Sequence, residues 1–222
     1  MASIGQMAAA ISHEIRNPLA VIRNHIYLIK LQRHNENIRL EKSLEVMEKE
    51  LEKANLIVSD LLSFSRKTYD TAADINLKRY FKELFEIVDK KGKSIEFELD
   101  CSAEHFLLIK KDILDYIFMN LLINAVDAIN DHGIITVRVS ISLNLKEYII
   151  TIEDSGCGID PGNMSRIFDP FFTTKANGEG TGLGLPIVYN QVKNLGGTIK
   201  AQSDGFKGTI FTICLPAGEK NV

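Results

Sequence analysis

The stretch "ISHEIRNPLAVI", residues 11–22, contains a histidine, an adjacent glutamate and, four residues after that glutamate, a proline. It lies within a longer run, from Ile4 to about Leu31, in which apolar residues recur at alternating steps of three and four. Such spacing places the apolar side chains on one face of a helix. The run therefore predicts one long amphipathic helix with the proline inside it.

A second run with the same spacing follows the polar stretch "RHNENI", residues 33–38. Two long helices joined by a short loop form an antiparallel hairpin, but a single hairpin cannot bury both apolar stripes. We therefore expect two chains to form a four-helix bundle, which makes the protein a homodimer. The apolar positions of the second run are Leu40, Leu44, Met47, Leu51, Ala54, Val58 and Leu61.

Pro18 lacks the N–H that would bond to the carbonyl of Glu14, and its ring crowds that carbonyl. We expect a local distortion in the turn that holds His13, Glu14 and Asn17. His13 lies about 200° around the helix from the apolar positions on either side of it, so its side chain is expected to face outward. A zinc site of the HExxH type is excluded, because the residue four after His13 is Asn17.

The bulk composition narrows the class of protein. The chain has 222 residues with 45% hydrophobic content, enough for one large domain or two small ones. Its 26 basic and 29 acidic residues give a net charge of −3, which favours neither nucleic acid nor an anionic membrane as partner. Three separated cysteines fit a reducing compartment.

No apolar run approaches the roughly 20 residues that span a bilayer. We therefore expect a cytoplasmic location without direct membrane contact for this sequence. The helical periodicity begins almost at Met1, with no capping segment before it. The sequence is thus expected to be a fragment, and membrane anchoring of the parent through an upstream part stays open.

The pattern changes at "RKTYDTAAD", residues 66–74, where the composition turns to Thr, Ala and Asp. We expect a helical hairpin at 1–68, a linker at 69–74 and a second domain at 75–222. Mixed helices and alternating strands predict an α+β sandwich with one mostly antiparallel sheet under helices. The expected helices are at about 78–91, 112–130 and 183–195, and the expected strands at 94–99, 105–109, 134–142, 147–153, 198–203 and 208–215.

Two glycine-rich segments in the second domain suit a nucleotide. In "GEGTGLGL", residues 178–185, glycines precede an expected helix, so backbone amides and the helix N-terminus can approach phosphates. In "DSGCGI", residues 154–159, Asp154 follows a strand and can accept a hydrogen bond from an exocyclic amine, while Gly156 and Gly158 leave room for a flat ring. Taken alone, the first segment is as often a simple loop, and an isolated Asp-x-Gly such as that in the second is most often a turn.

The segment "NLLINAVDA", residues 120–128, places Asn120 and Asn124 one helical turn apart on a shared face. Asparagine is costly on an apolar helix unless a partner uses its amide. Neutral amide oxygens suit a Mg²⁺ ion that is already bound to a triphosphate. Without the other segments, a pair of surface amides explains the pattern as well.

Together with "FDPFFTTK", residues 168–175, these segments resemble the N, G1, F and G2 boxes of the GHKL ATPases, and specifically the catalytic domain of sensor histidine kinases. The resemblance covers about residues 74–217 and implies a Bergerat-type sandwich that binds ATP. It implies that Asp154 reads the adenine amino group, that Asn124 supported by Asn120 binds Mg²⁺, and that Lys175 contacts phosphate. The residues implied to line the phosphates are Gly180, Thr181, Gly182, Leu183 and Gly184. Asp127 departs from the pattern, because many histidine kinases carry Lys or Arg three residues after the second asparagine.

The stretch "SHEIRNPL" resembles the phosphoacceptor box of the same kinases, over residues about 1–68. The resemblance implies that an imidazole nitrogen of His13 attacks the γ-phosphate of ATP. Glu14 would hold the proton on the other nitrogen as general base. Asn17 would position water against a phosphorylated partner, which implies phosphatase activity as well.

These features predict an autophosphorylating histidine kinase that passes phosphate from His13 to an aspartate on the receiver domain of a response regulator. One alternative is an ATP-driven clamp of the GHKL chaperone or mismatch-repair type, which would have no use for "SHEIRNPL". Another is an inactive scaffold that only dimerises, which the retained asparagines and glycines disfavour.

Overall fold

The computed structural model describes residues 4–31, 37–65, 72–102, 105–142, 147–175 and 180–217. Within the first two helices it describes the side chains of 15–30 and of most residues from 40 to 58. The chain divides into two compact units. One comprises residues 1–66 with 169–184, and the other comprises 67–168 with 185–222.

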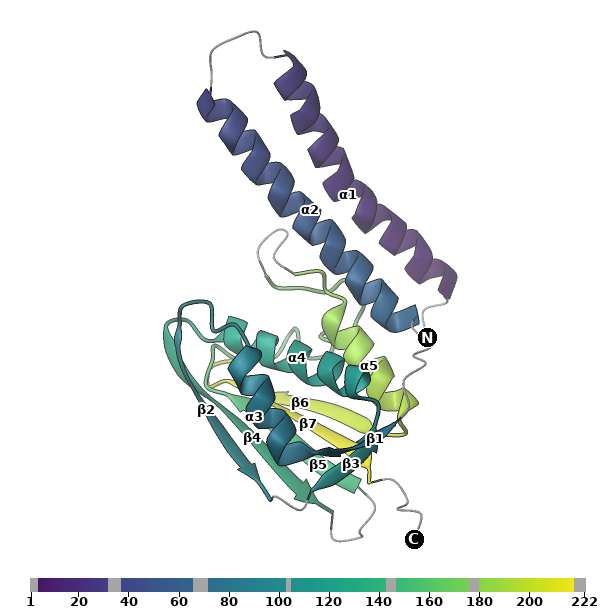
Figure 1. The fold of residues 1–222 in the computed structure, drawn as a ribbon, viewed down its shortest axis with the longest axis vertical. Helices are drawn as coiled ribbons and strands as arrows, with labels where there is room; N and C mark the ends of the chain where they lie inside the picture. The colour runs from purple at the N-terminus through teal and green to yellow at the C-terminus, as the bar shows by residue number, and fades with distance from the viewer. Residues whose placement is uncertain are drawn as a thin grey trace. The chain divides into compact units, whose positions relative to one another are not determined.

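The first unit contains a helical hairpin formed by α1 (Ile4–Leu31) and α2 (Asn37–Ser65), which pack along each other (Figure 1). The two predicted helical runs are therefore confirmed. Pro18 is buried, and α1 continues through it as one helix. The proline thus does not end the helix, and the predicted distortion of its local turn stays a prediction.

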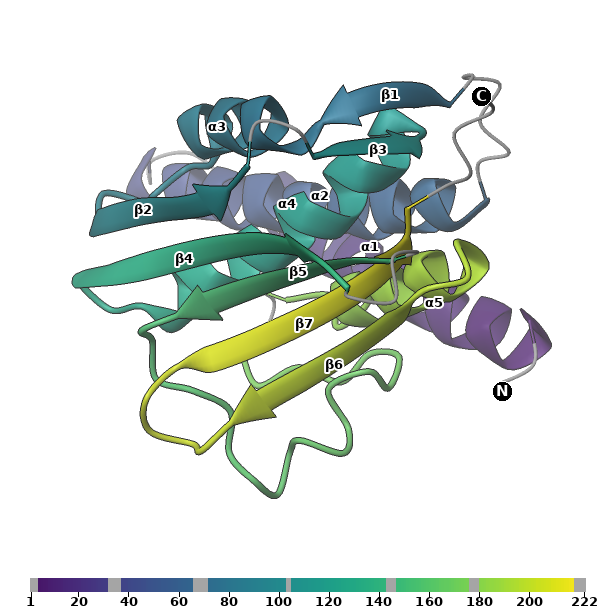
Figure 2. The same ribbon diagram turned by 90° about the horizontal axis from the view of Figure 1, so that it is seen from below.

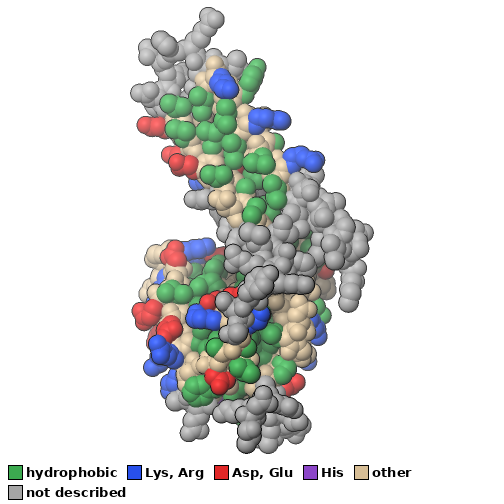
Figure 3. Space-filling view, turned by 45° about the vertical axis from the view of Figure 1, so that its right-hand side comes forward, with side chains coloured by type: hydrophobic (Ala, Val, Ile, Leu, Met, Phe, Trp, Pro, Cys, Tyr) green, Lys and Arg blue, Asp and Glu red, His purple; other side chains and the backbone are tan. Residues whose placement is uncertain are grey.

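Much of the apolar surface of the hairpin is exposed. Ala54 and Ile57 are buried, whereas Leu51 is 53% exposed and Tyr27 is 62% exposed. Hydrophobic side chains gather along the hairpin in the space-filling view (Figure 3). Other large apolar side chains that stay at least 36% exposed are Leu19, Ile26, Leu28, Leu40, Leu44 and Val58.

The second unit is built on a five-stranded sheet with the order β2-β4-β5-β7-β6 (Figure 2). The strand β2 pairs in parallel with β4, and the other pairs in this sheet are antiparallel. A separate antiparallel pair joins β1 (Ala73–Asn76) to β3 (Phe106–Ile109). The sheet strands are β2 (Ser94–Cys101), β4 (His132–Ile141), β5 (Glu147–Asp154), β6 (Thr198–Ser203) and β7 (Thr209–Pro216).

Three helices complete this α+β sandwich: α3 (Leu77–Ile87), α4 (Lys111–Ala128) and α5 (Gly184–Asn194). They lie on one side of the sheet (Figure 2). The rings of Phe81 on α3 and Phe118 on α4 pack edge to face, with their centroids 4.9 Å apart, and both side chains are fully buried. The core therefore lies between the helices and the inward-facing residues of the sheet, and the predicted fold class is confirmed.

Most element bounds lie within about two residues of the sequence prediction, and two regions differ by more. The strand β1 (Ala73–Asn76) overlaps the expected linker, because Ala73 to Asn76 find a partner strand in β3. The helix α3 ends at Ile87 instead of about residue 91. It ends there because the next residue, Val88, takes an extended conformation with a φ of −68° and a ψ of 120°. The exact domain bounds stay a prediction.

Candidate active site

Asp154 is the last residue of β5 and is 5% exposed. Its Oδ1 accepts a hydrogen bond of 2.8 Å from the backbone N–H of Gly156. Burial raises the pKa of Asp154 to about 6, while the backbone N–H groups of Gly156 and Thr209 act in the opposite direction. At neutral pH the group is therefore mostly a carboxylate. A buried carboxylate accepts hydrogen bonds and donates none, which suits an amine donor on a ligand.

The loop after Asp154 lies directly against the end of α4. A side chain added at Gly156 would place its Cβ 2.6 Å from the carbonyl carbon and oxygen of Ala128. The backbone N–H of Cys157 donates to the same Ala128 oxygen at 2.9 Å. Gly156 is therefore required for the packing of this loop on α4, in addition to any room that it leaves for a ligand.

Asn120 and Asn124 lie on α4, and both side chains are half-buried. The amide nitrogen of Asn120 donates to the carbonyl of Tyr116 at 2.9 Å. The amide nitrogen is thus hydrogen-bonded within the helix. The amide oxygen is the atom that can accept a hydrogen bond or coordinate a metal ion. The opposite face of α4 packs into the core through Leu121, Leu122 and Ala125.

Asp127, where the family pattern has a basic residue, is paired with a lysine from elsewhere in the chain. The ammonium of Lys91, in the turn between α3 and β2, lies 2.5 Å from Asp127 Oδ1. Lys93 belongs to the same turn. Its ammonium donates hydrogen bonds to the backbone carbonyls of Val126, at 2.8 Å, and Ile129, at 2.6 Å. The sequence prediction did not include these lysines, because their contacts depend on the tertiary fold.

The glycine-rich segment before α5 has a tightly fixed backbone. Gly182 has a φ of 63°, and an added Cβ would lie 2.4 Å from the carbonyl carbon of Phe171. Phe171 itself has a φ of 67°, and its N–H donates to the Gly182 carbonyl at 2.9 Å. Thr181 Oγ1 accepts a hydrogen bond from the N–H of Leu183 at 3.2 Å, and Leu183 is buried. These contacts hold the residues that lead into α5.

Of the other predicted phosphate contacts, Lys175 is half-buried, and its backbone N–H donates to Thr173 Oγ1 at 3.2 Å. Gly184 is the first residue of α5. Gly180 is followed directly by Thr181, and an added Cβ at Gly180 would lie 2.7 Å from Thr173 Oγ1. Residues 176–179, between Lys175 and Gly180, lie outside the described residues.

The predicted acceptor residues lie on α1, where the backbone is helical from Ile4 to Leu31. Asn17 is exposed. The side chains of His13 and Glu14 lie outside the described residues, so their predicted contact and the outward orientation of His13 stay predictions.

Sequence reasoning missed one feature next to Asp154. An added Cβ at Gly208, which has a φ of 95°, would lie against the backbone oxygen of Asp154. Gly208 therefore allows the β6–β7 connection to approach the end of β5. The only sequence signal was a glycine before a strand, which is typical of many turns.

Two features are absent from the described part of the chain. No group of three or more His, Cys, Asp and Glu side chains there has the geometry to hold a metal ion. No described helix is long and apolar enough to cross a membrane.

Two family profiles match the chain. Residues 3–70 match the His Kinase A (phospho-acceptor) domain, and residues 109–219 match the histidine kinase-, DNA gyrase B-, and HSP90-like ATPase. The chain belongs to the sensor histidine kinases. His13, Glu14 and Asn17 of this histidine kinase fall within the first match, and Asn120, Asn124 and Asp154 fall within the second.

Known histidine kinases are similar to the chain over nearly its whole length. Sensor histidine kinase ZraS of Salmonella typhi is 36% identical over 219 residues, which are 97% of this chain and 46% of that protein. The histidine-protein kinase AtoS of Escherichia coli K12 is 33% identical over 97% of this chain and 35% of that protein. The chain thus spans about half the length, or less, of these relatives.

Solved structures share the fold. Histidine kinase ThkA, in complex with the response regulator protein TrrA, superposes with a TM-score of 0.75 and 24% identity over 99% of this chain and 63% of that chain. Acinetobacter baumannii histidine kinase AdeS gives a TM-score of 0.70 and 22% identity over 93% of this chain and 98% of that chain.

Proposed function

We propose that the protein is an ATP-dependent histidine kinase that phosphorylates itself on His13 and passes the phosphate to an aspartate of a response regulator. The observation that carries the proposal is the presence, in one chain, of a phosphoacceptor box on a helical hairpin and a buried acceptor carboxylate, Asp154, in an ATPase-type sandwich. A GHKL clamp has a use for only the second of these.

ATP is the proposed substrate. The carboxylate of Asp154 accepts a hydrogen bond from the exocyclic amine of adenine. The phosphates lie against the N-terminus of α5, where the helix dipole favours anions, and are lined by Gly180, Thr181, Gly182, Leu183 and Gly184. Lys175 adds a positive charge.

Mg²⁺ is the proposed cofactor, and the asparagines of α4 fit it. The nitrogen of Asn120 is committed to Tyr116, which leaves an amide oxygen, the type of ligand that Mg²⁺ accepts. Asn124 would be the ligand and Asn120 its support. When bound, the ion neutralises negative charge on the triphosphate.

The transfer of the γ-phosphoryl group replaces a phosphorus–oxygen bond of ATP by a phosphorus–nitrogen bond to His13. The lone pair of a neutral imidazole nitrogen of His13 forms the N–P bond, while the bond from the γ-phosphorus to the bridging oxygen breaks and ADP leaves. Glu14 accepts the hydrogen bond from the proton on the other nitrogen and stabilises the positive charge that develops there. Such reactions depend mainly on positioning and charge neutralisation.

Two partners belong to this proposal. A second copy of the chain would cover the exposed apolar residues of the hairpin and complete a four-helix bundle. A response-regulator receiver domain would take the phosphate, and exposed Asn17 would orient the water that later removes it. ThkA was solved in complex with a response regulator, which is consistent with this second partner.

Incubation with γ-labelled ATP tests the function. We expect an acid-labile, alkali-stable label on the native chain and none on His13→Gln. ATP turnover that the substitution leaves unchanged, without label, would instead support an ATP-driven clamp. A chain that binds no ATP would support the scaffold.

A further inference from the structure

The turn between α3 and β2 presents a lysine in an unusual backbone conformation. Lys91 and Gly92 both have positive φ, and the N–H of Lys93 donates to the Lys90 carbonyl at 3.0 Å, a pattern typical of a type I′ turn. Lysine rarely adopts this region, which favours glycine, asparagine and aspartate. The Asp89 side chain supports it by accepting the N–H of Lys91 at 2.8 Å. Such departures from preferred geometry concentrate at functional sites.

This turn brings two positive charges to the end of α4. The ammonium of Lys93 bonds to two carbonyls of that end, and the ammonium of Lys91 pairs with Asp127. The last turn of α4 contains no basic residue of its own. The lysines therefore supply the cations that favour a helix C-terminus.

Helix stability alone does not explain Asp127. A carboxylate in the last turn adds negative charge to the negative end of the helix dipole. The ion pair contributes little stability in return, since the Lys91 side chain is 50% exposed. Alanine at this position would serve the helix better. The pair is better explained as a means of holding the ammonium of Lys91 at this place.

The ammonium of Lys91 is thereby held next to Asn124, the proposed magnesium ligand. Asp127 follows Asn124 by three residues, so the two side chains are neighbours on the surface of α4. Many histidine kinases carry Lys or Arg at the position of Asp127. In this chain the positive charge beside that position is the ammonium of Lys91, which comes from the α3–β2 turn of the same unit.

We propose that Lys91, positioned by Asp127, is a phosphate-binding residue of this kinase and replaces the basic residue that α4 lacks. The inference rests on the proposed function, because it assumes that ATP binds beside Asn124. The flexible stem of Lys91 allows its ammonium to turn from Asp127 to a phosphate oxygen, with Asp127 as the positioning residue.

The test compares ATP with adenosine, which has no phosphates, by titration calorimetry of the full chain in Mg²⁺. We expect Lys91→Gln to weaken ATP binding by about tenfold, the usual size for one charge-assisted hydrogen bond, and to leave adenosine binding unchanged. Asp127→Lys, added to Lys91→Gln, should restore ATP affinity by returning a cation to α4.

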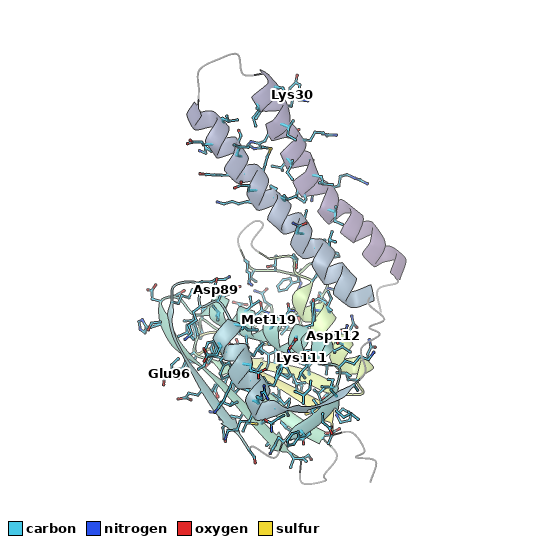
Figure 4. All side chains as sticks on the ribbon, in the orientation of Figure 1. Lys30, Asp89, Glu96, Lys111, Asp112 and Met119 are labelled. Atoms are coloured by element: carbon cyan, nitrogen blue, oxygen red, sulfur yellow. The ribbon has the colours of Figure 1, made fainter. Side chains whose placement is uncertain are left out.

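Lys111→Gln is the matched control. Lys111 also pairs with an aspartate of α4, Asp115, at 2.9 Å, and is comparably exposed. It lies at the opposite end of α4 from Asp89 and the α3–β2 turn (Figure 4). We expect its removal to leave ATP affinity within about twofold of the native value, since charges at this distance are screened.

Three results would overturn the inference: native ATP affinity in Lys91→Gln, an equal loss of adenosine affinity, which would indicate a merely structural lysine, or no recovery in the double variant. A native chain that binds neither ATP nor adenosine would instead overturn the proposed function as a whole.

Discussion

At the scale of single residues, Asp154 combines burial with a net charge. A carboxylate that is 5% exposed is unfavourable in the free protein, and the pKa of about 6 reflects that cost. A ligand amine that donates to it relieves part of the cost. If Asp154 binds adenine as proposed, its burial has two measurable consequences.

The first consequence concerns ligand affinity. Because only the carboxylate accepts strongly, adenosine affinity should fall by about tenfold between pH 7.5 and pH 5, as Asp154 takes up a proton. Adenosine is the suitable ligand, since it carries no phosphate that titrates in this range. Calorimetry at several pH values measures the effect. A flat profile would mean that Asp154 does not contact adenine.

The second consequence concerns stability. The pKa of Asp154 is raised from an ordinary value of 3.8 to about 6 in the folded chain, so the native state holds more protons between these values. The free energy of unfolding should therefore decrease as pH rises from about 4 to about 6, by about 2 kcal/mol. Asp154→Asn should lack this decrease. Urea unfolding followed by circular dichroism, without nucleotide, compares the two proteins, and parallel curves would contradict the argument.

At the scale of elements, the periodicity of apolar residues was sufficient to predict long helices and strands in which apolar and polar residues alternate. The bounds of α1 follow directly from its apolar spacing. The strand β1 was not predictable from Ala73 to Asn76, because its pairing with β3 depends on residues 30 to 36 positions away. The early end of α3 depends on the extended conformation of Val88, whose side chain is buried in the core.

Within α1, Pro18 is expected to lower the stability of the helix. Pro18→Ala should restore a backbone hydrogen bond within α1 and stabilise the helix, by up to about 3 kcal/mol less the packing of the buried ring. If the distorted turn lets Glu14 reach His13, the substitution should also change the ratio of kinase to phosphatase activity. Thermal unfolding and label transfer to a response regulator measure both. A more stable helix with an unchanged ratio would exclude the proline as a control point.

At the scale of the whole molecule, the candidate site illustrates the limits of sequence reasoning. Asp154, Asn120 and Asn124 were identifiable because each belongs to a short motif with fixed spacing. Ala128, Gly208 and Lys91 were not, because their contacts join segments distant in sequence. Motif spacing thus identifies groups that contact a ligand more readily than groups that hold them in place.

The assembly of two chains is the prediction at this scale. Leu44 and Leu51 are 44% and 53% exposed and lie on one side of α2, seven residues apart. Leu44→Glu combined with Leu51→Glu should convert the dimer to a monomer, because charge would be buried in the bundle core. Sedimentation velocity measures the change.

Exposed Lys49, on the opposite side of α2, provides the control. Lys49→Gln changes the net charge by the same single unit as each leucine substitution and should leave the dimer intact. A dimer that survives both glutamates would mean that another surface holds the chains together.

The bond between Phe171 and Gly182 has a consequence for engineering and for evolution. Because the two ends of the segment 172–181 are joined by their own backbones, the cost of closing this loop depends only weakly on its length. Doubling the number of residues would cost about 0.6 kcal/mol in chain entropy. Insertions between Lys175 and Gly180 should thus leave the entry into α5 in its present geometry and keep the proposed phosphate-binding residues in the chain, so this is the point at which the loop can change length.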